Sequence, residues 1–365
     1  MIVPFNDLQR GYNLFQAEYE SKALEILRSG WYILGQEVKC FENEFSEANE
    51  VKYCVGVDNG LNALTLSLLA LGIETGDEVI VQSNTYIATV LAVTHNHAIP
   101  VFVEPDKYYN IDVNRIEEKI TSKTKAILVT HLYGQASQME RIVELCDKYK
   151  LFLVEDCAQA HFAQYNNQNV GTFGQIGCFS FYPTKNLGGF GDGGAVLTNN
   201  EVLATKIATL RNYGSNKKYN NEIEGFNSRL DELQAGLLRI KLKHFNDLKR
   251  NRIKIAERYL QGIDNSIVYL PNVRKGSTSI WHLFVVRVEN RKRFRKYLQD
   301  YGITTEIHYP IPPYLSDAYM YLQYQTGDYP LAEEYANTVV SLPIFDGMTL
   351  AEVDYVINII NQFRG

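Results

Sequence analysis

The chain has 365 residues, of which 45% are hydrophobic and 21% charged, the balance of a globular protein with a large core, and its length favours two domains. Its 36 Lys and Arg against 42 Asp and Glu give a net charge of −6, which offers no electrostatic reason to bind nucleic acid or an anionic membrane. Together with the absence of any apolar run near the roughly 20 residues that span a bilayer, these numbers exclude fibrous, disordered and membrane-spanning classes.

The amino terminus and the cysteines both favour a cytoplasmic protein. Residues Met1–Asp7 lack the basic region and the apolar run of a signal peptide. The five cysteines are odd in number and form no C-x-x-C pair, which argues against a disulfide framework and a zinc ribbon. We therefore expect a reducing compartment, no metal, and neither a membrane nor a nucleic-acid partner.

Short β-branched and apolar runs alternate with longer helical patterns over the first two thirds of the chain. The predicted strands are Tyr53–Val57, Glu78–Gln82, Pro100–Val103, Ala126–Thr130, Leu151–Glu155, Ile176–Phe181 and Ala195–Thr198. The amphipathic segments between them are Gly60–Leu71, Thr85–Thr94, Val113–Ile120 and Gln138–Lys150. This alternation is typical of an α/β fold with a mostly parallel seven-stranded sheet covered on both faces.

From about Asp231 the pattern changes. A long helix predicted over Asp231–Leu260 has the form of a spine between two domains. The segments expected after it are a strand, a helix, a Pro-rich loop and a last helix: His282–Val288, Arg291–Tyr301, Tyr309–Tyr314 and Leu350–Phe363. We expect a large domain over residues 1–245 and a small α+β domain over 246–365.

Ligands bind at the carboxyl ends of parallel strands, so the residues that follow each predicted strand are the first candidates. The strand Leu151–Glu155 is followed by Asp156, for which a helix N-cap is the simplest role. The next strand is followed by Lys185, on a loop that Pro183 and the glycines after it keep irregular. A loop lysine is usually a solvated charge. An acid and a lysine from adjacent strand ends, however, are the two groups that a pyridoxal phosphate (PLP) site requires.

Two further features fit that cofactor. Gly60–Leu64 follow the first strand and open an apolar helix, whose free N–H groups and dipole can bind a phosphate, although an ordinary tight turn would look the same. Tyr86 follows the second strand and can either stack on a pyridine ring or pack against the next helix.

Rival motifs have weaker support. The run Gly189–Gly194 imitates a dinucleotide fingerprint but precedes a strand instead of opening a helix. His95 and His97 have no Cys or carboxylate nearby, which argues against a metal site. The basic run Arg291–Lys296 has the spacing of a helix with one buried face and one solvated face. No G-x-S-x-G elbow exists for a serine nucleophile.

Taken together, these features show that the chain resembles the DegT family of sugar-nucleotide aminotransferases, within the fold-type I PLP enzymes. The resemblance runs from Pro4 to the last helix and rests on seven stretches: Gly30–Gly35, Asn59–Leu64, Asn84–Thr89, Glu155–Gln159, Ser180–Gly188, Asn227–Gln234 and Ile307–Pro310. The chain departs from the family in reading Asn-Gly-Leu-Asn over 59–62, where many members have Ser-Gly-Thr-Asp, and in having Tyr314 where a histidine is frequent.

The resemblance implies a role for each matching position. Lys185 matches the Schiff-base lysine, Asp156 the carboxylate at the pyridine nitrogen, Gln159 the partner of the 3-hydroxyl, and Tyr86 the stacked aromatic. The positions implied for the phosphate are Gly60, Leu61, Asn62 and Ser180, together with Asn227, which would reach the cofactor of the neighbouring subunit. The positions implied for the sugar are Tyr182, Tyr213, His308 and Tyr309.

We therefore predict a PLP-dependent aminotransferase that works as a homodimer with shared sites. By resemblance it moves an amino group from L-glutamate to C3 of a dTDP-linked 3-keto-6-deoxyhexose, because the segment Ser180–Gly188, with Tyr182, is similar to that branch. Amination at C4 of a nucleotide-linked 4-keto-sugar is the alternative. A PLP-fold sensor or scaffold without turnover is the hypothesis from another class.

Overall fold

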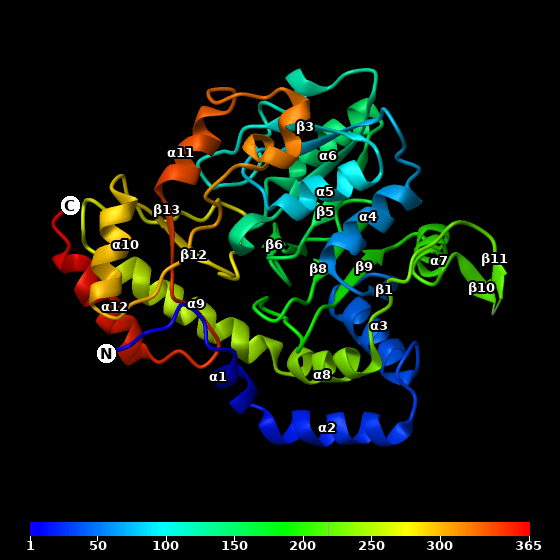
Figure 1. Ribbon diagram of the computed structural model, residues 1–365, viewed down its shortest axis with the longest axis horizontal. Coiled ribbons are helices and arrows are strands. Elements are labelled where there is room, and N and C mark those ends of the chain that lie inside the picture. Colours follow the sequence, from blue (N-terminus) through cyan, green and yellow to red (C-terminus); the bar gives the residue numbers. More distant parts are fainter. Residues whose placement is uncertain (218) are drawn as a thin grey trace.

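The computed structural model describes residues 1–217 and 219–365, and its centre is a seven-stranded sheet (Figure 1). The strand order is β1-β9-β8-β5-β4-β2-β3. The bounds are β1 Tyr53–Val57, β2 Glu78–Gln82, β3 Ile99–Val103, β4 Thr124–Thr130, β5 Phe152–Asp156, β8 Ile176–Ser180 and β9 Gly194–Thr198. Only β9 runs antiparallel to its neighbours, β1 and β8. The prediction of a mostly parallel seven-stranded sheet is confirmed.

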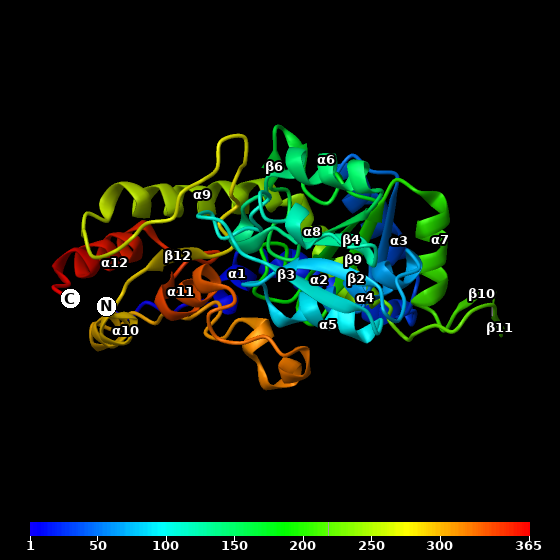
Figure 2. The same ribbon diagram turned by 90° about the horizontal axis from the view of Figure 1, so that it is seen from above.

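Helices cover both faces of this sheet because its strands are apolar on both sides. Alternate residues of β4 belong to different cores: Ile127 and Val129 to one, Ala126 and Leu128 to the other. The first core is closed by α3 (Gln36–Ala48), α6 (Met139–Tyr149) and α8 (Glu232–Lys243). The second is closed by α4 (Gly60–Ala70), α5 (Ile87–His95) and α7 (Glu201–Leu210). Figure 2 shows α6 on one side of the sheet and α4 and α5 on the other.

One predicted amphipathic segment is wrong. Residues 113–120 contain only a 3₁₀ turn, Glu117–Lys119. The Asp112 carboxylate accepts the N–H of Asn114 at 3.0 Å, and this turn bends the chain before a helix can start. The segment still buries Val113 and Ile116, so its apolar residues are used without a helix.

The prediction of a single helix over Asp231–Leu260 is also wrong, because this segment contains two helices. The second is α9, Phe245–Gly262, and His244 separates it from α8. The His244 ring stacks on Phe15 at 4.1 Å between centroids, and its Nε2 lies 2.8 Å from Glu18. Both partners belong to the amino-terminal helical segment, α1 (Leu8–Asn13) and α2 (Gln16–Ser29) with the linker between them, so the break fits the chain to helices that the sequence pattern did not reveal.

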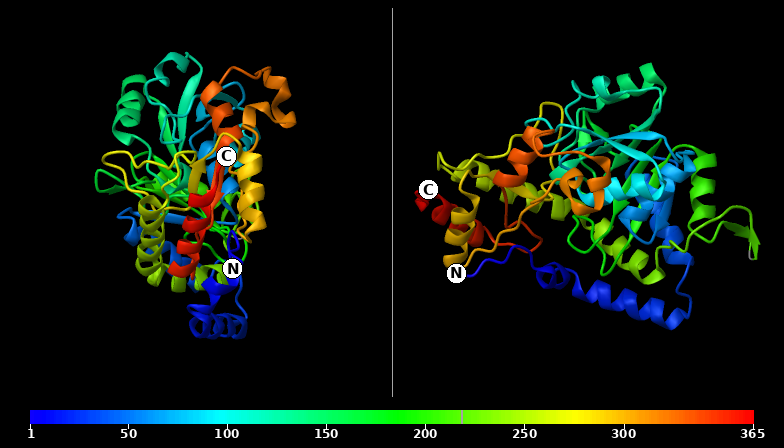
Figure 3. Two further views of the ribbon diagram at one scale, coloured as in Figure 1. Left: turned by 90° about the vertical axis from the view of Figure 1, so that its left-hand side faces the viewer. Right: turned by 45° about the horizontal axis from the view of Figure 1, so that its top comes forward.

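The carboxyl-terminal third has a core of its own. It contains β12 (Phe284–Arg287) paired antiparallel with β13 (Val339–Leu342), and the helices α10 (Arg291–Asp300), α11 (Pro330–Thr338) and α12 (Leu350–Gln362). Val3 joins this core and bridges Ile303, so both termini lie at the same end of the molecule (Figure 3). The domain boundary at residue 245 stays a prediction, which this separate core supports.

Two smaller features complete the fold. The remaining strands form two short ribbons, β6 (Gln164–Tyr165) with β7 (Gln168–Asn169) and β10 (Ser215–Lys217) with β11 (Asn220–Asn221). Within residues 1–217 and 219–365, no helix has both the length and the apolar character that crossing a membrane demands.

Candidate active site

Lys185 lies on the loop between β8 and β9, at the carboxyl edge of the parallel strands. Its backbone N–H donates to the carbonyl of Tyr182 at 2.8 Å, while its Nζ makes no hydrogen bond or ion pair with any residue that the structure describes. Burial lowers the pKa of this amine to about 8, and nearby Asp156 opposes the shift. An amine that is partly neutral near pH 7 can act as a nucleophile and as a base.

The loop is held by the residue after the lysine. The Asn186 amide donates to the carbonyl of Ile280 at 3.0 Å, and its Oδ1 lies 3.0 Å from Nδ1 of His282. Both partners precede β12, so this buried asparagine ties the lysine loop to the chain that leads into the carboxyl-terminal core.

Asp156 is the last residue of β5 and is buried beside Lys185. Its Oδ2 accepts the Thr89 hydroxyl at 2.8 Å, and its Oδ1 accepts the N–H of Ala158 at 3.1 Å. Burial raises the pKa of the carboxyl, whereas these two donors and Lys185 lower it. The carboxylate is thereby oriented at the strand end, where a cationic ring nitrogen would compensate its buried charge.

A second buried acid, Glu155, stands beside His131 and Cys157 in a group with metal-ligand residue types. Its oxygens are already occupied. One accepts the N–H groups of Phe173 and Gly174, and the other accepts that of Gly171 and lies 3.1 Å from Nε2 of His131. A carboxylate with four donors has no lone pair left for an ion, so this group stabilises the turn at 171–174.

The amino terminus of α4 holds the residues that the sequence predicts for phosphate binding. Asn59 caps the helix by accepting the N–H of Asn62 at 2.8 Å, and the N–H groups of Gly60 and Leu61 have no partner within the described chain. A Cβ on Gly60 would lie 2.6 Å from Cβ of Ser180, so only glycine allows the Ser180 hydroxyl to lie this close to the helix end. The Asn62 side chain is turned to Asp58 at 3.0 Å.

Two tyrosine side chains lie next to each other near the carboxyl ends of the strands. The rings of Tyr86 and Tyr309 lie 5.0 Å apart, and the Gln159 amide donates to the Tyr309 hydroxyl at 3.0 Å. The structure therefore brings together three of the sequence-predicted residues, one of which comes from the far end of the chain. Nδ1 of His308, the residue before Tyr309, lies within hydrogen-bond distance of the Ser341 hydroxyl, at 2.8 Å. Burial lowers the pKa of His308 to about 4.

Other predicted residues lie at the surface instead. The side chains of Tyr182 and Tyr213 are 51% and 50% exposed, and Asn227 is exposed. Asn227 forms a backbone bridge with Asn212. Its neighbour Ser228 donates to Asp58, immediately before the phosphate site of the same chain. Tyr314, where the family often has histidine, is buried and donates to Glu333 at 2.9 Å, so its hydroxyl is used within the fold.

Sequence reasoning missed three residues around the site: Thr89, Tyr133 and Asn186. Each is polar and buried. Thr89 and Asn186 lie within three residues of a predicted site residue, Tyr86 and Lys185 respectively, whereas Tyr133 lies far in sequence from all of them. A buried polar side chain near a strand end is a signal for such a residue. The partner it bonds is set by tertiary structure.

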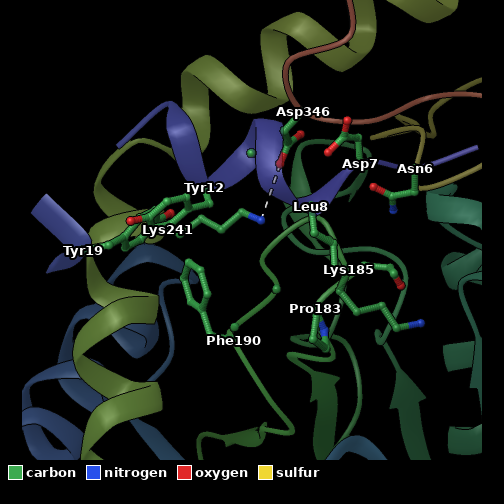
Figure 4. Close-up of a pocket in the computed structure, with 14 residues that line it drawn as sticks. Asn6, Asp7, Leu8, Tyr12, Tyr19, Pro183, Lys185, Phe190, Lys241 and Asp346 are labelled. Atoms are coloured by element: carbon green, nitrogen blue, oxygen red, sulfur yellow. Dashed lines mark ion pairs between the residues drawn. The ribbon is translucent and has the colours of Figure 1, made fainter. Parts of the chain in front are cut away.

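A cavity of about 190 Å³ reaches Lys185 from the side of α1 (Figure 4). Its wall includes the ion pair of Lys241 with Asp346 at 3.4 Å, and Asn6 and Phe190 line it as well. Figure 4 shows the Lys185 amine extending away from this ion pair. The second lysine of the cavity is thus paired with a carboxylate, whereas the Lys185 amine has no hydrogen bond or ion pair among the described residues.

The residues present fit PLP. Lys185 offers an unpaired amine, Asp156 a buried carboxylate, and the turn at Gly60 two free N–H groups beside a serine hydroxyl. Tyr86 and Gln159 lie along the same edge and can contact the ring face and a ring hydroxyl. These groups are the amine, anion and phosphate partners that the cofactor requires.

The lowered pKa of Lys185 carries a first prediction. At pH 7 about a tenth of an amine with a pKa near 8 is neutral, against about 1 in 3,000 for an amine near 10.5. We expect the rate at which the cofactor-free protein takes up PLP at Lys185 to rise from pH 6.5 and level off near pH 9. Borohydride reduction followed by peptide mapping measures this rate at Lys185 alone. A rate still rising steeply above pH 10 would contradict the lowered pKa.

Comparisons with known proteins identify the family of this chain. The model of the DegT/DnrJ/EryC1/StrS aminotransferase family matches residues 14–361. The chain is 51% identical over 363 residues to dTDP-3-amino-3,6-dideoxy-alpha-D-galactopyranose transaminase of Aneurinibacillus thermoaerophilus, with 99% of each chain covered. It superposes on Streptomyces venezuelae DesV in complex with ketimine intermediate with a TM-score of 0.97, at 44% identity, covering 99% of this chain and 98% of that one.

A further solved structure bears on the cofactor. NtdA from Bacillus subtilis with bound cofactor PMP superposes with a TM-score of 0.92, at 31% identity, and the match covers 98% of this chain and 84% of that one. The predictions of the fold type, of the aminotransferase family and of PLP as the cofactor are confirmed by these comparisons.

Proposed function

Because the chain belongs to the DegT/DnrJ/EryC1/StrS aminotransferase family, we propose that it transfers an amino group from L-glutamate to C3 of a dTDP-linked 3-keto-6-deoxyhexose. The product is a dTDP-3-amino-3,6-dideoxyhexose. The observation that carries this proposal is the unpaired, partly neutral Lys185 beside the buried Asp156, at a site that fits PLP. The relative named for a dTDP-3-amino-3,6-dideoxyhexose supports the choice of substrate.

When bound, PLP supplies an electron sink for the carbon that loses its proton. Lys185 would hold the cofactor and move the proton, because its amine is unpaired among the described residues and burial lowers its pKa to about 8. The negative charge of Asp156 would favour a positive charge on the ring nitrogen of the cofactor. The Thr89 hydroxyl orients this carboxylate. The N–H groups at Gly60 and Leu61 with the Ser180 hydroxyl hold the phosphate.

We assign the sugar to the side of the cofactor site on which residues of the carboxyl-terminal third lie. Tyr309 contacts Gln159 and Tyr86, and His308 precedes it. Tyr182, three residues before Lys185, is half exposed and available to a ligand. These contacts support a sugar bound between the lysine loop and the segment at 308–309, with its ketone near Lys185.

The test of the proposed reaction uses both keto-sugars. The purified protein with PLP and glutamate is incubated with a dTDP-linked 3-keto-6-deoxyhexose and, separately, with a nucleotide-linked 4-keto-sugar, and the amines are detected by mass. We expect amination of the 3-keto compound. Turnover of the 4-keto compound alone would move the assignment to C4. A visible cofactor band that glutamate does not bleach would leave a binding protein without turnover.

We further propose a homodimer with shared sites in the cytoplasm. Asn227 and Tyr213 are exposed on neighbouring segments of this chain, and Trp31 and Tyr32 add exposed aromatic surface. Exposed apolar side chains of this size support a protein partner, and a two-fold dimer is the commonest closed assembly. Five free cysteines support a reducing compartment.

Complementation tests the shared site. An inactive Lys185→Ala protein is mixed with an Asn227→Ala protein of low activity under conditions that allow subunit exchange. If Asn227 serves the partner's cofactor, each hybrid dimer has one site with both residues intact, and about a quarter of all sites regain full activity. A mixture no more active than its components, with exchange verified by mass, would show that each chain completes its own site.

A further inference from the structure

Tyr133 is a buried residue to which the proposed function gives no role. It follows β4 and is 7% exposed. Its backbone has a φ of 60°, in the left-handed region that a tyrosine rarely adopts. A residue held in this region costs free energy, and it persists only where its surroundings fix it, most often near functional sites.

The contacts of Tyr133 reach three separate segments. Its N–H donates to Oε1 of Gln159 at 2.7 Å, and its carbonyl accepts the N–H of Leu283 at 3.3 Å. Its hydroxyl donates to the backbone carbonyl of His308. One residue therefore joins the chain after β5, the residue before β12 and the loop that carries His308 and Tyr309.

The first of these contacts determines how Gln159 is oriented. A backbone N–H can only donate, so the oxygen of the Gln159 amide faces Tyr133 and its NH₂ group faces away. That NH₂ group donates to the Tyr309 hydroxyl at 3.0 Å. Tyr133, Gln159, Tyr309 and His308 thus form a closed ring of contacts between the two ends of the site.

The Tyr133 hydroxyl is suited to this purpose because it stays a donor. Burial raises the pKa of the phenol well above its usual value, and the ring packs against Tyr109 at 5.3 Å between centroids. Without the hydroxyl, the carbonyl of His308 would lose its partner, and the hydrogen bonds left to the segment at 308–309 would be those of the Tyr309 hydroxyl and of His308 Nδ1.

We propose that Tyr133 is a positioning residue that holds the His308–Tyr309 segment against Gln159 and so sets where the keto-sugar lies relative to the cofactor ring. This inference rests on the proposed function. A positioning role would affect the two halves of the reaction differently, whereas a purely structural role would affect both alike. Lys185 and Asp156 serve both halves of the reaction, but only the sugar half depends on the Tyr133 hydroxyl.

The test compares Tyr133→Phe with Tyr335→Phe. Tyr335 belongs to the same apolar cluster, is 4% exposed, and its hydroxyl donates to the backbone carbonyl of Asp106 at 2.9 Å, so the control removes the same kind of bond elsewhere. Each half-reaction is followed separately on the protein with PLP: bleaching of the cofactor band by glutamate, and its return on adding the keto-sugar. Deuterium exchange over residues 303–311 is measured in parallel without substrate.

For Tyr133→Phe we expect a rise of about tenfold in KM for the keto-sugar and a change within about twofold in the glutamate half-reaction, with faster exchange over 303–311. Tyr335→Phe should show none of the three. Equal losses in both half-reactions, the same losses in Tyr335→Phe, or no change would overturn the inference. If the wild-type protein aminates no keto-sugar, the proposed function fails, and the exchange comparison alone decides whether Tyr133 holds the segment.

Discussion

Replacing Lys185 with alanine is expected to lower amino transfer at least about 10⁴-fold while leaving the chain folded. The variant loses the amine that holds the cofactor and the base that moves the proton. Lys241, the other lysine of the cavity, cannot take over, because it is paired with Asp346 at 3.4 Å. Mass detection of the amino-sugar measures the loss, and the visible band of the bound cofactor should disappear with it.

A matched control is Lys249→Met. Lys249 is also a partly buried lysine with a lowered pKa, but its Nζ donates to the carbonyl of Phe162 at 2.9 Å, away from the strand ends. Its replacement should leave the rate within about twofold. A Lys185→Ala protein that retained more than about 1% of the wild-type rate would show that another group performs the proton transfer.

Much of the site could be predicted because it depends on where strands end. Apolar runs of four to six residues identified each strand of the sheet, and parallel strands bring their carboxyl ends to one edge. Asp156 and Lys185 were therefore placed near each other from local pattern alone. The structure bears this out to the extent that each shifts the pKa of the other.

The contacts that orient these residues could not be predicted, since they join segments with no common pattern. Thr89 bonds Asp156 across 67 residues, and Asn186 meets His282 across 96. Nothing in the local sequence around a threonine in the first turn of an apolar helix indicates which residue it will bond. The break at His244 was missed for the same reason, because it is set by Phe15 and Glu18.

Replacing Asp156 with asparagine is expected to lower amino transfer about 10²–10³-fold with the cofactor still bound. The amide oxygen can still accept from Thr89 or Ala158, so the side chain keeps its place. It loses the negative charge that favours a protonated ring nitrogen, and the electron sink weakens with it. The rate of bleaching by glutamate measures the loss, and the dependence of the cofactor band on pH should change as well.

The neighbouring acid is the control that separates chemistry from folding. Consecutive strand residues face opposite sides of the sheet, and Glu155 points to the turn at 171–174, where its two oxygens face four N–H groups, that of His131 among them. In Glu155→Gln an NH₂ group would face donors whichever way the amide turned, so we expect a loss of about 2–3 kcal/mol in unfolding free energy and a nearly normal rate per folded molecule. Asp156→Asn should show the reverse. If the rates of both variants simply follow their stabilities, Asp156 only supports the fold, and the assignment of its charge to the cofactor is wrong.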